Sequence, residues 1–190
     1  MVPAPLLHKL INRIALYDDP IAYKEIFVQY HARLVNFSQS ITGSKESSEE
    51  VVSDVFLKIW TMRANLPRIE NFHLYIYIIT KNLSINRVLQ QKKEKVFSLD
   101  DAVVDLKSIY LDPEQLLITA EMYKKLRLAV DGLPPKCRLI FKLVKEDGLK
   151  YREVAELLGL SLKTIENQMT IALKKLGQSV SFDLSKKALN

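Results

Sequence analysis

The chain of 190 residues has few cysteines, glycines and histidines: one, five and three, respectively. A single cysteine excludes an intramolecular disulfide and fits a reducing compartment. The small number of glycines excludes a collagen-like or low-complexity chain. No run approaches the ~20 apolar residues of a membrane-spanning helix, and the N-terminus lacks the continuous apolar core of a signal peptide. These absences favour a cytoplasmic protein without membrane insertion.

Patterns for catalysis and metal binding are also missing. His8, His31 and His73 share no ligand spacing with one another or with Cys137, so no metal site is predicted. There is no glycine-rich phosphate-binding motif that would hold a nucleotide. The acidic residues have no histidine nearby in the sequence. We therefore expect no catalytic residues, no cofactor and no enzymatic activity.

Apolar and basic residues, by contrast, are abundant. Hydrophobic residues make up 48% of the chain, which is enough for a buried core. The net charge of +6 and the isoelectric point of about 9.3 favour an anionic partner. Apolar residues recur at helical spacing almost throughout, and strand-like alternation is scarce. The sequence therefore predicts an all-α fold.

A helix-turn-helix pattern occupies residues 149–176. Gly159 can adopt the positive φ that ends a first helix, and Ser161 is a good N-cap for a second. Pro135 is suited to the first position of a preceding helix, which extends the prediction to a three-helix unit over residues 133–176. The predicted apolar faces of the two motif helices consist of Tyr151, Val154, Ala155, Leu158, Ile165, Met169, Leu173 and Leu176.

The second helix of such a motif enters the DNA major groove. Its outward side carries amide, carboxylate and amino groups, which can pair with adenine, with cytosine, and with guanine or phosphate. Nine basic residues face five acidic ones between residues 136 and 176, which favours DNA binding over a merely solvated surface. The predicted DNA-binding residues of this helix are Lys163, Thr164, Glu166, Asn167, Thr170 and Lys174.

Three further helices are predicted in the N-terminal half. The first begins with Asp19 as N-cap and Pro20 at its first position. The second has a capping-box spacing at Ser47 and Glu50. The third starts with aromatic residues and carries five basic residues against one acidic residue between residues 81 and 95. Aromatic and basic residues together suit single-stranded nucleic acid, although most of these rings are expected to belong to the core.

The composition changes between residues 96 and 122, where six acidic residues face one basic residue and no helical apolar row is sustained. This stretch is typical of a linker. We predict two small helical domains joined by this acidic linker. The predicted boundaries are 1–95 for the first domain, 96–122 for the linker, 123–178 for the second domain and 179–190 for a C-terminal tail.

The order of these segments resembles the extracytoplasmic-function (ECF) group of bacterial sigma factors. EEVVSDVFLKIW is similar to the family's region 2.2, and NFHLYIYIITKNLSINRVLQQKK to regions 2.3 and 2.4. GLKYREVAELLGLSLKTIENQMTIALKKL is similar to region 4.2. The resemblance implies a sigma region 2 domain, which binds core RNA polymerase and recognises and melts the −10 promoter element. It also implies a region 4 domain, which recognises the −35 element through the helix-turn-helix.

The resemblance also implies individual roles. Region 2.2 would bind the clamp helices of the polymerase β′ subunit, and region 4 would contact the β-flap. Residues 61–71 would form a pocket for a base flipped out of the −10 element, and an anti-sigma factor is an expected further partner. The residues implied for −10 DNA are Lys81, Asn82, Asn86 and Arg87. Those implied for core polymerase are Glu50, Ser53, Asp54 and Lys58.

Two other functions fit parts of the sequence. A stand-alone helix-turn-helix regulator would bind palindromic DNA as a dimer and ignore the polymerase. It explains residues 149–176 but not the N-terminal helices with their separate basic end. A helical protein-interaction adaptor without nucleic-acid function is the second alternative. Binding to core polymerase distinguishes the first alternative, and promoter-dependent transcription distinguishes the second.

Overall fold

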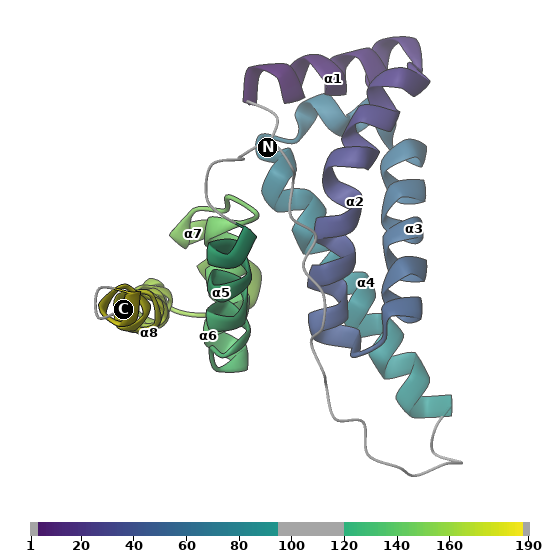
Figure 1. The fold of residues 1–190 in the computed structure, drawn as a ribbon. Helices are drawn as coiled ribbons and strands as arrows, with labels where there is room; N and C mark the ends of the chain where they lie inside the picture. Colours follow the sequence, from purple (N-terminus) through teal and green to yellow (C-terminus); the bar gives the residue numbers. More distant parts are fainter. Residues whose placement is uncertain (1–3, 95–119, 188–190) are drawn as a thin grey trace. The chain divides into compact units, whose positions relative to one another are not determined.

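The computed structural model describes residues 4–94 and 120–187 of the chain. Every regular element within these residues is a helix, which confirms the predicted all-α class. The chain divides into two compact units, Met1–Tyr110 and Leu111–Asn190 (Figure 1). Within the described residues, no helix is long and apolar enough to cross a membrane.

The described part of the first unit contains four α-helices and one 3-10 helix. They are α1 (Ala4–Tyr17), α2 (Pro20–Thr42), α3 (Lys45–Thr61), η1 (Arg63–Arg68) and α4 (Phe72–Glu94). Helices α2 and α3 form an antiparallel hairpin, and α4 packs against both (Figure 1). Helix α1 packs on α2 and η1. The apolar sides of α1, α2, α3 and α4 therefore share one core.

Helix α2 begins where the sequence predicts. Oδ1 of Asp19 accepts hydrogen bonds from the backbone N–H groups of Ile21, at 2.8 Å, and Ala22, at 3.2 Å, and Pro20 occupies the first turn. These bonds satisfy two backbone donors that have no partner within the helix. At the other end Gly43 adopts φ 72°, a left-handed conformation that stops the helix.

Helix α3 begins earlier than predicted, and the predicted capping box is wrong. Ser44 is the N-cap, because its hydroxyl accepts a hydrogen bond from the backbone N–H of Ser47 at 3.3 Å. Ser47 is therefore inside the first turn and buried, where its hydroxyl accepts a hydrogen bond from Nε2 of Gln91 on α4 at 2.8 Å. Glu50 forms an ion pair with Arg87 of α4 rather than returning to cap the helix.

The aromatic residues at the start of α4 mostly belong to the core, as expected. Phe72 and Tyr77 are buried, and their rings lie against Tyr30 and Phe37 of α2. These two rings are therefore not available to stack on nucleic-acid bases. Tyr75 is half-buried, and its hydroxyl donates a hydrogen bond to Sδ of Met62 at 3.1 Å.

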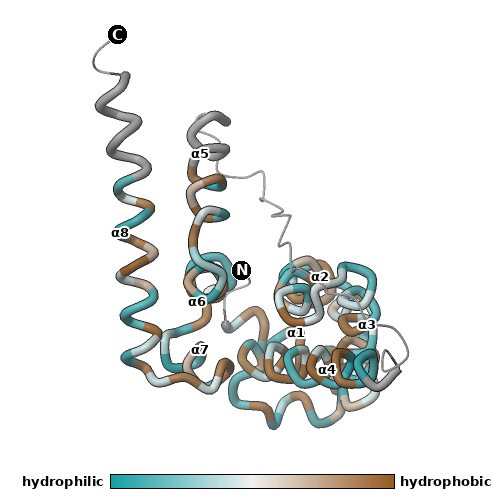
Figure 2. Tube along the Cα trace, turned by 90° about the horizontal axis from the view of Figure 1, so that it is seen from below, coloured by the Kyte–Doolittle hydropathy of each residue, from teal (hydrophilic) through white to brown (hydrophobic). Residues whose placement is uncertain are grey.

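The second unit is organised around its last helix. Helices α5 (Ala120–Asp131), α6 (Pro135–Lys145) and α7 (Tyr151–Leu158) each pack against α8 (Leu162–Lys187). The sequence predicted three helices over residues 133–176. The structure has a fourth, α5, before them, and α8 continues to Lys187. Hydrophobic and hydrophilic residues alternate along α8 (Figure 2), as expected for a helix covered on one side.

Local turn chemistry in this unit follows the sequence prediction. Pro135 stands at the start of α6, and Gly159 ends α7 with φ 65° and ψ 38°. The hydroxyl of Ser161 accepts a hydrogen bond from the backbone N–H of Thr164 at 3.1 Å, and so caps the start of α8. The two motif helices are thus joined by a turn that Gly159 and Ser161 stabilise independently.

Of the predicted buried positions of the motif, Leu173 is wrong, and Tyr151 and Leu158 are only half-buried. Leu173 is 50% exposed, because Ala172 instead faces the core beside Leu133 and Cys137. At about 100° per residue, Ala172 lies closer than Leu173 to the middle of the buried row of Ile165, Met169 and Leu176, so the core covers Ala172 and leaves Leu173 at the edge. On α7 Leu157 is fully buried, whereas the predicted Leu158 is only half-buried. The remaining buried residues of α8 are Ile165, Met169 and Leu176.

The predicted acidic linker falls mostly outside the described residues. Only its last three residues, 120–122, are described, and they form the start of α5.

We predict that Gly159→Ala destabilises the second unit by about 1–2 kcal/mol, the cost of placing a Cβ in a left-handed conformation. No atom within 4 Å would meet that Cβ, so the whole effect is conformational. Gly177→Ala is the matched control, because Gly177 lies within α8 and has equally open surroundings. Hydrogen exchange of the buried amides of α6 and α8 measures both. Equal protection in the two variants would contradict the prediction.

Candidate nucleic-acid interface

The predicted DNA-reading residues of α8 gather on one side of the helix. Lys163, Asn167, Thr170 and Lys174 are exposed, whereas Thr164 and Glu166 are half-buried. The buried row of Ile165, Met169, Ala172 and Leu176 holds the helix in this orientation. An exposed polar row at helical spacing, opposite a packed row, is the arrangement that a recognition helix requires.

Contacts within α8 distinguish the roles of its polar residues. The ammonium group of Lys163 lies 3.7 Å from the carboxylate of Glu166, and the Thr170 hydroxyl donates to the Glu166 carbonyl at 2.9 Å. Oγ1 of Thr164 lies 2.8 Å from Oγ of Ser161, so this side chain also belongs to the helix cap. Asn167 lies in the middle of the exposed row, where its amide can form hydrogen bonds with a base edge.

The basic end of α4 does not bring all four predicted −10 residues together. Asn82 and Asn86 are one turn apart and exposed, and Lys81 is half-buried at their edge. Arg87 lies about 140° around the helix from Asn82, at ~100° per residue. It points toward α3, where its guanidinium forms an ion pair with Glu50.

The predicted polymerase-binding residues share one exposed side of α3. Glu50, Ser53, Asp54 and Lys58 are all exposed and spaced at helical intervals. The structure adds Leu57, which sequence analysis missed: it is 64% exposed and lies between Asp54 and Lys58 on the same side. Its position four residues after Ser53 was the available signal, because that spacing places it outside the buried valine row.

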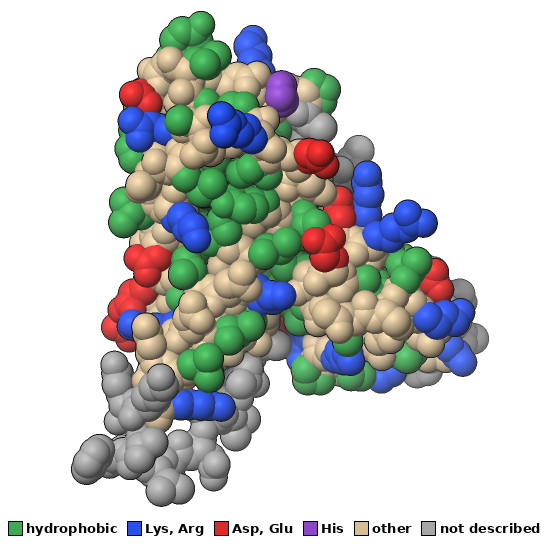
Figure 3. Space-filling view, turned by 180° about the vertical axis from the view of Figure 1, so that it is seen from behind, with side chains coloured by type: hydrophobic (Ala, Val, Ile, Leu, Met, Phe, Trp, Pro, Cys, Tyr) green, Lys and Arg blue, Asp and Glu red, His purple; other side chains and the backbone are tan. Residues whose placement is uncertain are grey.

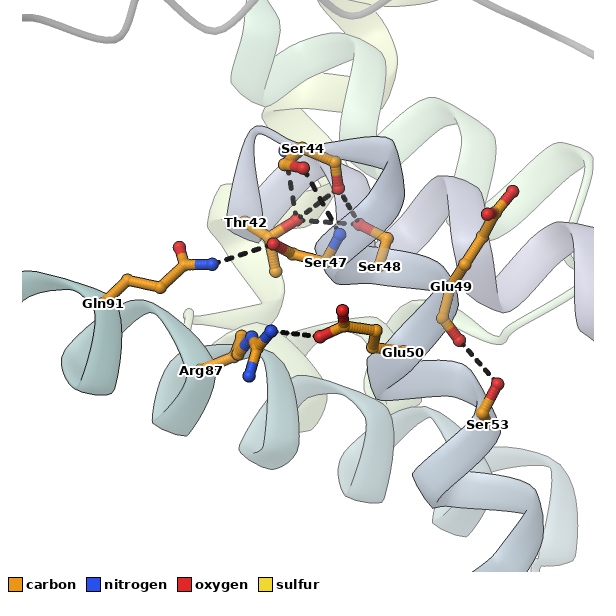
Figure 4. A network of polar contacts seen from close by, with 9 residues as sticks. All are labelled: Thr42, Ser44, Ser47, Ser48, Glu49, Glu50, Ser53, Arg87 and Gln91. Carbon is orange, nitrogen blue, oxygen red and sulfur yellow. Dashed lines mark hydrogen bonds and ion pairs between the residues drawn. The ribbon is translucent and has the colours of Figure 1, made fainter. Parts of the chain in front are cut away.

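A network of polar contacts joins α3 to the basic end of α4 (Figure 4). Glu50 pairs with Arg87, and Ser47 accepts a hydrogen bond from Gln91 one turn further along α4. Two residues that were predicted to bind different partners, the polymerase and the DNA, are thus bound to each other. The two predicted surfaces are consequently adjacent rather than separate.

The segment between α3 and α4 is fixed to its surroundings. Arg63 donates to the Trp60 carbonyl at 3.1 Å, lies 4.8 Å from the centre of the Trp60 ring, and forms an ion pair with Asp18. The hydrogen bond from Arg63 holds the pKa of the Asp18 carboxyl below its usual value. Leu66 of η1 is fully buried. These contacts hold residues 61–71 in place beside the start of α4.

Cys137 has a packing role. It is fully buried in α6, and its thiol donates a hydrogen bond to the Gln168 carbonyl of α8 at 3.2 Å. Burial raises the pKa of the thiol, which disfavours the reactive thiolate. No group of three or more His, Cys, Asp and Glu side chains that could hold a metal ion occurs in the described part of the chain.

We predict that the Glu50–Arg87 pair contributes only about 0.2–1 kcal/mol to stability, since both side chains are partly exposed. A double-mutant cycle with Glu50→Gln and Arg87→Gln measures this coupling. The chain's one tryptophan, Trp60, reports unfolding of the first unit by fluorescence. The exposed Lys45–Glu49 pair, at 3.6 Å, is the control. A Glu50–Arg87 coupling well above 1 kcal/mol would show that this pair is desolvated.

Known families match both units. A family model described as sigma-70 region 2 matches residues 26–94, and one described as sigma-70 region 4 matches residues 123–176. Together they cover well over half of the chain. The solved structure of RpoE in complex with the anti-sigma factor NepR from Bartonella quintana has a TM-score of 0.55. It is 20% identical, covering 85% of this chain and 98% of that one. At this identity, the likeness shows the fold.

Curated relatives agree with the family models. The ECF RNA polymerase sigma factor SigW of Bacillus subtilis is 20% identical over 171 residues, which cover 86% of this chain and 91% of that protein. The ECF sigma factor SigE of Mycolicibacterium smegmatis is 22% identical over 148 residues, which cover 78% of this chain but only 57% of that protein. With a sigma region in each helical unit and ECF sigma factors among its relatives, the chain belongs to the sigma-70 family and, within it, to the ECF group of RNA polymerase sigma factors.

Proposed function

We propose that this sigma factor binds core RNA polymerase and directs it to start transcription at promoters whose −10 and −35 elements it reads. The observation that carries the proposal is the exposed polar row of α8, held outward by a buried row in the unit that matches region 4. Such a row can enter the −35 major groove, with the start of the helix nearest the base edges.

The first unit supports a second, separate contact with DNA. Asn82 and Asn86 offer amide groups to bases, and Lys81 offers a positive charge to phosphate. Residues 61–71 lie beside the start of the same helix and are proposed to receive a flipped base. Flipping costs a few kcal/mol, which contacts in such a pocket must offset. Melting of the −10 element would therefore depend on this unit.

The exposed side of α3 is proposed as the surface for the polymerase β′ clamp helices. Leu57 gives it an apolar centre, and Glu50, Ser53, Asp54 and Lys58 surround that centre with polar groups. An apolar centre with a polar rim is typical of protein interfaces. The second unit is proposed to contact the β-flap, which would set the separation of the two DNA-reading units.

The predicted boundaries were 1–95, 96–122, 123–178 and 179–190; because α5 begins at Ala120 and α8 runs to Lys187, the proposed second domain takes in residues on both sides of 123–178. Cytoplasmic location follows from the proposed partners. Regulation by an anti-sigma factor is also proposed, since one solved relative is bound to the anti-sigma factor NepR. A stand-alone dimeric regulator is not favoured, because region 2 accounts for the first unit, which that alternative leaves unexplained.

Run-off transcription tests the proposed function. The full chain is added to core polymerase on a random promoter library, and the transcribed templates are sequenced. We expect defined start sites that share two elements at a fixed separation. Transcription that starts equally without the chain, or a chain that does not co-purify with core polymerase, would refute the proposal.

For base reading, we expect Asn167→Ala to cost about 1–3 kcal/mol of binding at one base position of the −35 element. Lys174→Ala is the matched comparison on the same helix. It should weaken all sequences about equally and reduce the salt dependence of binding, as expected for a phosphate contact. Affinities of the holoenzyme for single-base variants of a selected promoter measure both. A uniform loss in Asn167→Ala would show that Asn167 does not read a base.

A further inference from the structure

Helix α1 is the part of the first unit that the family model does not account for. The match to sigma-70 region 2 begins at residue 26, so α1 and the turn after it lie outside the matched residues. Figure 1 shows α1 lying across the end of the hairpin formed by α2 and α3. None of the proposed contacts with DNA or polymerase uses this helix. Its role therefore has to be inferred from the elements against which it packs.

Helix α1 is the main packing partner of η1, the 3-10 helix within residues 61–71. Leu66 of η1 is fully buried, whereas the other residues of η1 are half-buried or exposed. The hydrogen bonds of a 3-10 helix have poorer geometry than those of an α-helix, so so short an element depends on tertiary contacts. The buried row of α1 that supplies such contacts consists of Leu10, Ile11 and Ile14.

An ion pair joins the turn after α1 to the start of the same segment. Asp18, between α1 and α2, pairs with Arg63, which also donates to the Trp60 carbonyl at 3.1 Å and lies 4.8 Å from the centre of the Trp60 ring. Asp18 adopts φ 50°, a left-handed conformation that Asp and Asn tolerate better than most residues. The turn is thus connected through Arg63 to the last turn of α3, where residues 61–71 begin.

Helix α4 holds the other end of the segment. Oδ1 of Asn71 accepts a hydrogen bond from the backbone N–H of Leu74 at 3.1 Å, and the Tyr75 hydroxyl donates to Sδ of Met62 at 3.1 Å. Figure 3 views the first unit from the side of α4 and shows hydrophobic side chains interspersed with Lys and Arg. Since α4 fixes one end of residues 61–71, the arrangement of the whole segment depends on how α1 fixes the other.

We propose that α1, through the Asp18–Arg63 pair, holds residues 61–71 in the arrangement that selects the flipped base of the −10 element. The inference rests on the proposed function and adds Asp18 to it as a positioning residue. The negative charge of Asp18 would repel DNA phosphates, so it acts through Arg63. A pocket that is correctly arranged for only part of the time binds its base more weakly in proportion. Loss of the pair would therefore reduce selection of that base and leave the other DNA contacts unchanged.

The sign of the effect distinguishes positioning from direct DNA binding by Arg63. If Arg63 bound a phosphate, Asp18 would compete with the DNA for the guanidinium, and removing the charge of Asp18 would strengthen binding. If the pair positions the segment, removing either partner weakens base selection. Substitutions of Asp18 and Arg63 therefore act in the same direction only in the second case.

The test uses holoenzyme assembled from core polymerase and the full chain. The probes are fork-junction DNAs from a promoter selected by the run-off experiment, with the single-stranded −10 non-template strand exchanged one base at a time. Asp18→Asn removes the charge but keeps a residue type that adopts the left-handed conformation. Asp18→Asn and Arg63→Gln should each reduce discrimination at one −10 position about two- to fivefold, the range for a partly exposed ion pair. The double variant should lose no more than Arg63→Gln alone.

Two controls separate this effect from general damage to α1 or to DNA binding. Arg13→Gln removes the neighbouring pair with Asp19, at 2.6 Å, which links α1 to the start of α2 rather than to residues 61–71. It should leave base discrimination unchanged. Asn82→Ala should reduce discrimination at a different −10 position, because its amide lies on α4. Thermal unfolding followed by circular dichroism verifies that each variant is folded.

Stronger fork-junction binding of Asp18→Asn would assign Arg63 to the DNA and overturn the inference. Unchanged discrimination in Asp18→Asn, a loss spread equally over all −10 positions, or an equal loss in Arg13→Gln would overturn it too. Each of these results leaves the proposed function intact. An unaltered holoenzyme that discriminates no base of the −10 element would instead refute the proposed function.

Discussion

The burial of one side of α8 against α5, α6 and α7 is the interaction on which the second unit depends. Ile165, Met169 and Ala172 are removed from water on that side, and the helical period then leaves Asn167 and Lys174 on the opposite side. The stability of the unit and the direction of the proposed DNA-reading groups thus have the same cause. A substitution that rotated α8 about its axis would therefore lower the stability of the unit and change the direction of these side chains.

The first unit uses the same constraint in a different way. Helices α3 and α4 pack against each other and against α2, and each keeps one side exposed. The exposed sides are chemically distinct: Leu57 with acidic and hydroxyl groups on α3, and Asn82 with Leu89 on α4. The ion pair between Glu50 and Arg87 joins α3 to α4 at the boundary between these two exposed sides. The partners proposed for these two sides would therefore lie close to each other.

Four of the predicted helix-end residues were confirmed, whereas the capping box predicted at Ser47 and Glu50 was wrong. Asp19, Pro135, Gly159 and Ser161 all act as the sequence indicates, because a cap or a left-handed turn is decided by groups within a few residues. The exposed row of α8 was predictable for a related reason, since its spacing is regular and its polar residues are uninterrupted. The spacing of Leu57 from Ser53 places it on the exposed side, but one apolar residue on such a side does not by itself predict an interface, and Leu57 was not found.

The sequence by itself determined most of the helices, several of their caps and the sets of residues that share a side, because these depend on local bonds and on a fixed period of 3.6 residues. Helices α1 and α5 were not predicted. Tertiary structure decided which side of a helix is covered and which polar group finds a distant partner. Ala172 is buried beside Leu133 and Cys137, whereas Leu173 is exposed, because α8 turns the side of Ala172 toward α6. Ser47 becomes a partner of Gln91, and not a cap, because α4 crosses α3 there. Such outcomes depend on neighbours that are far away in the chain, which no local pattern records.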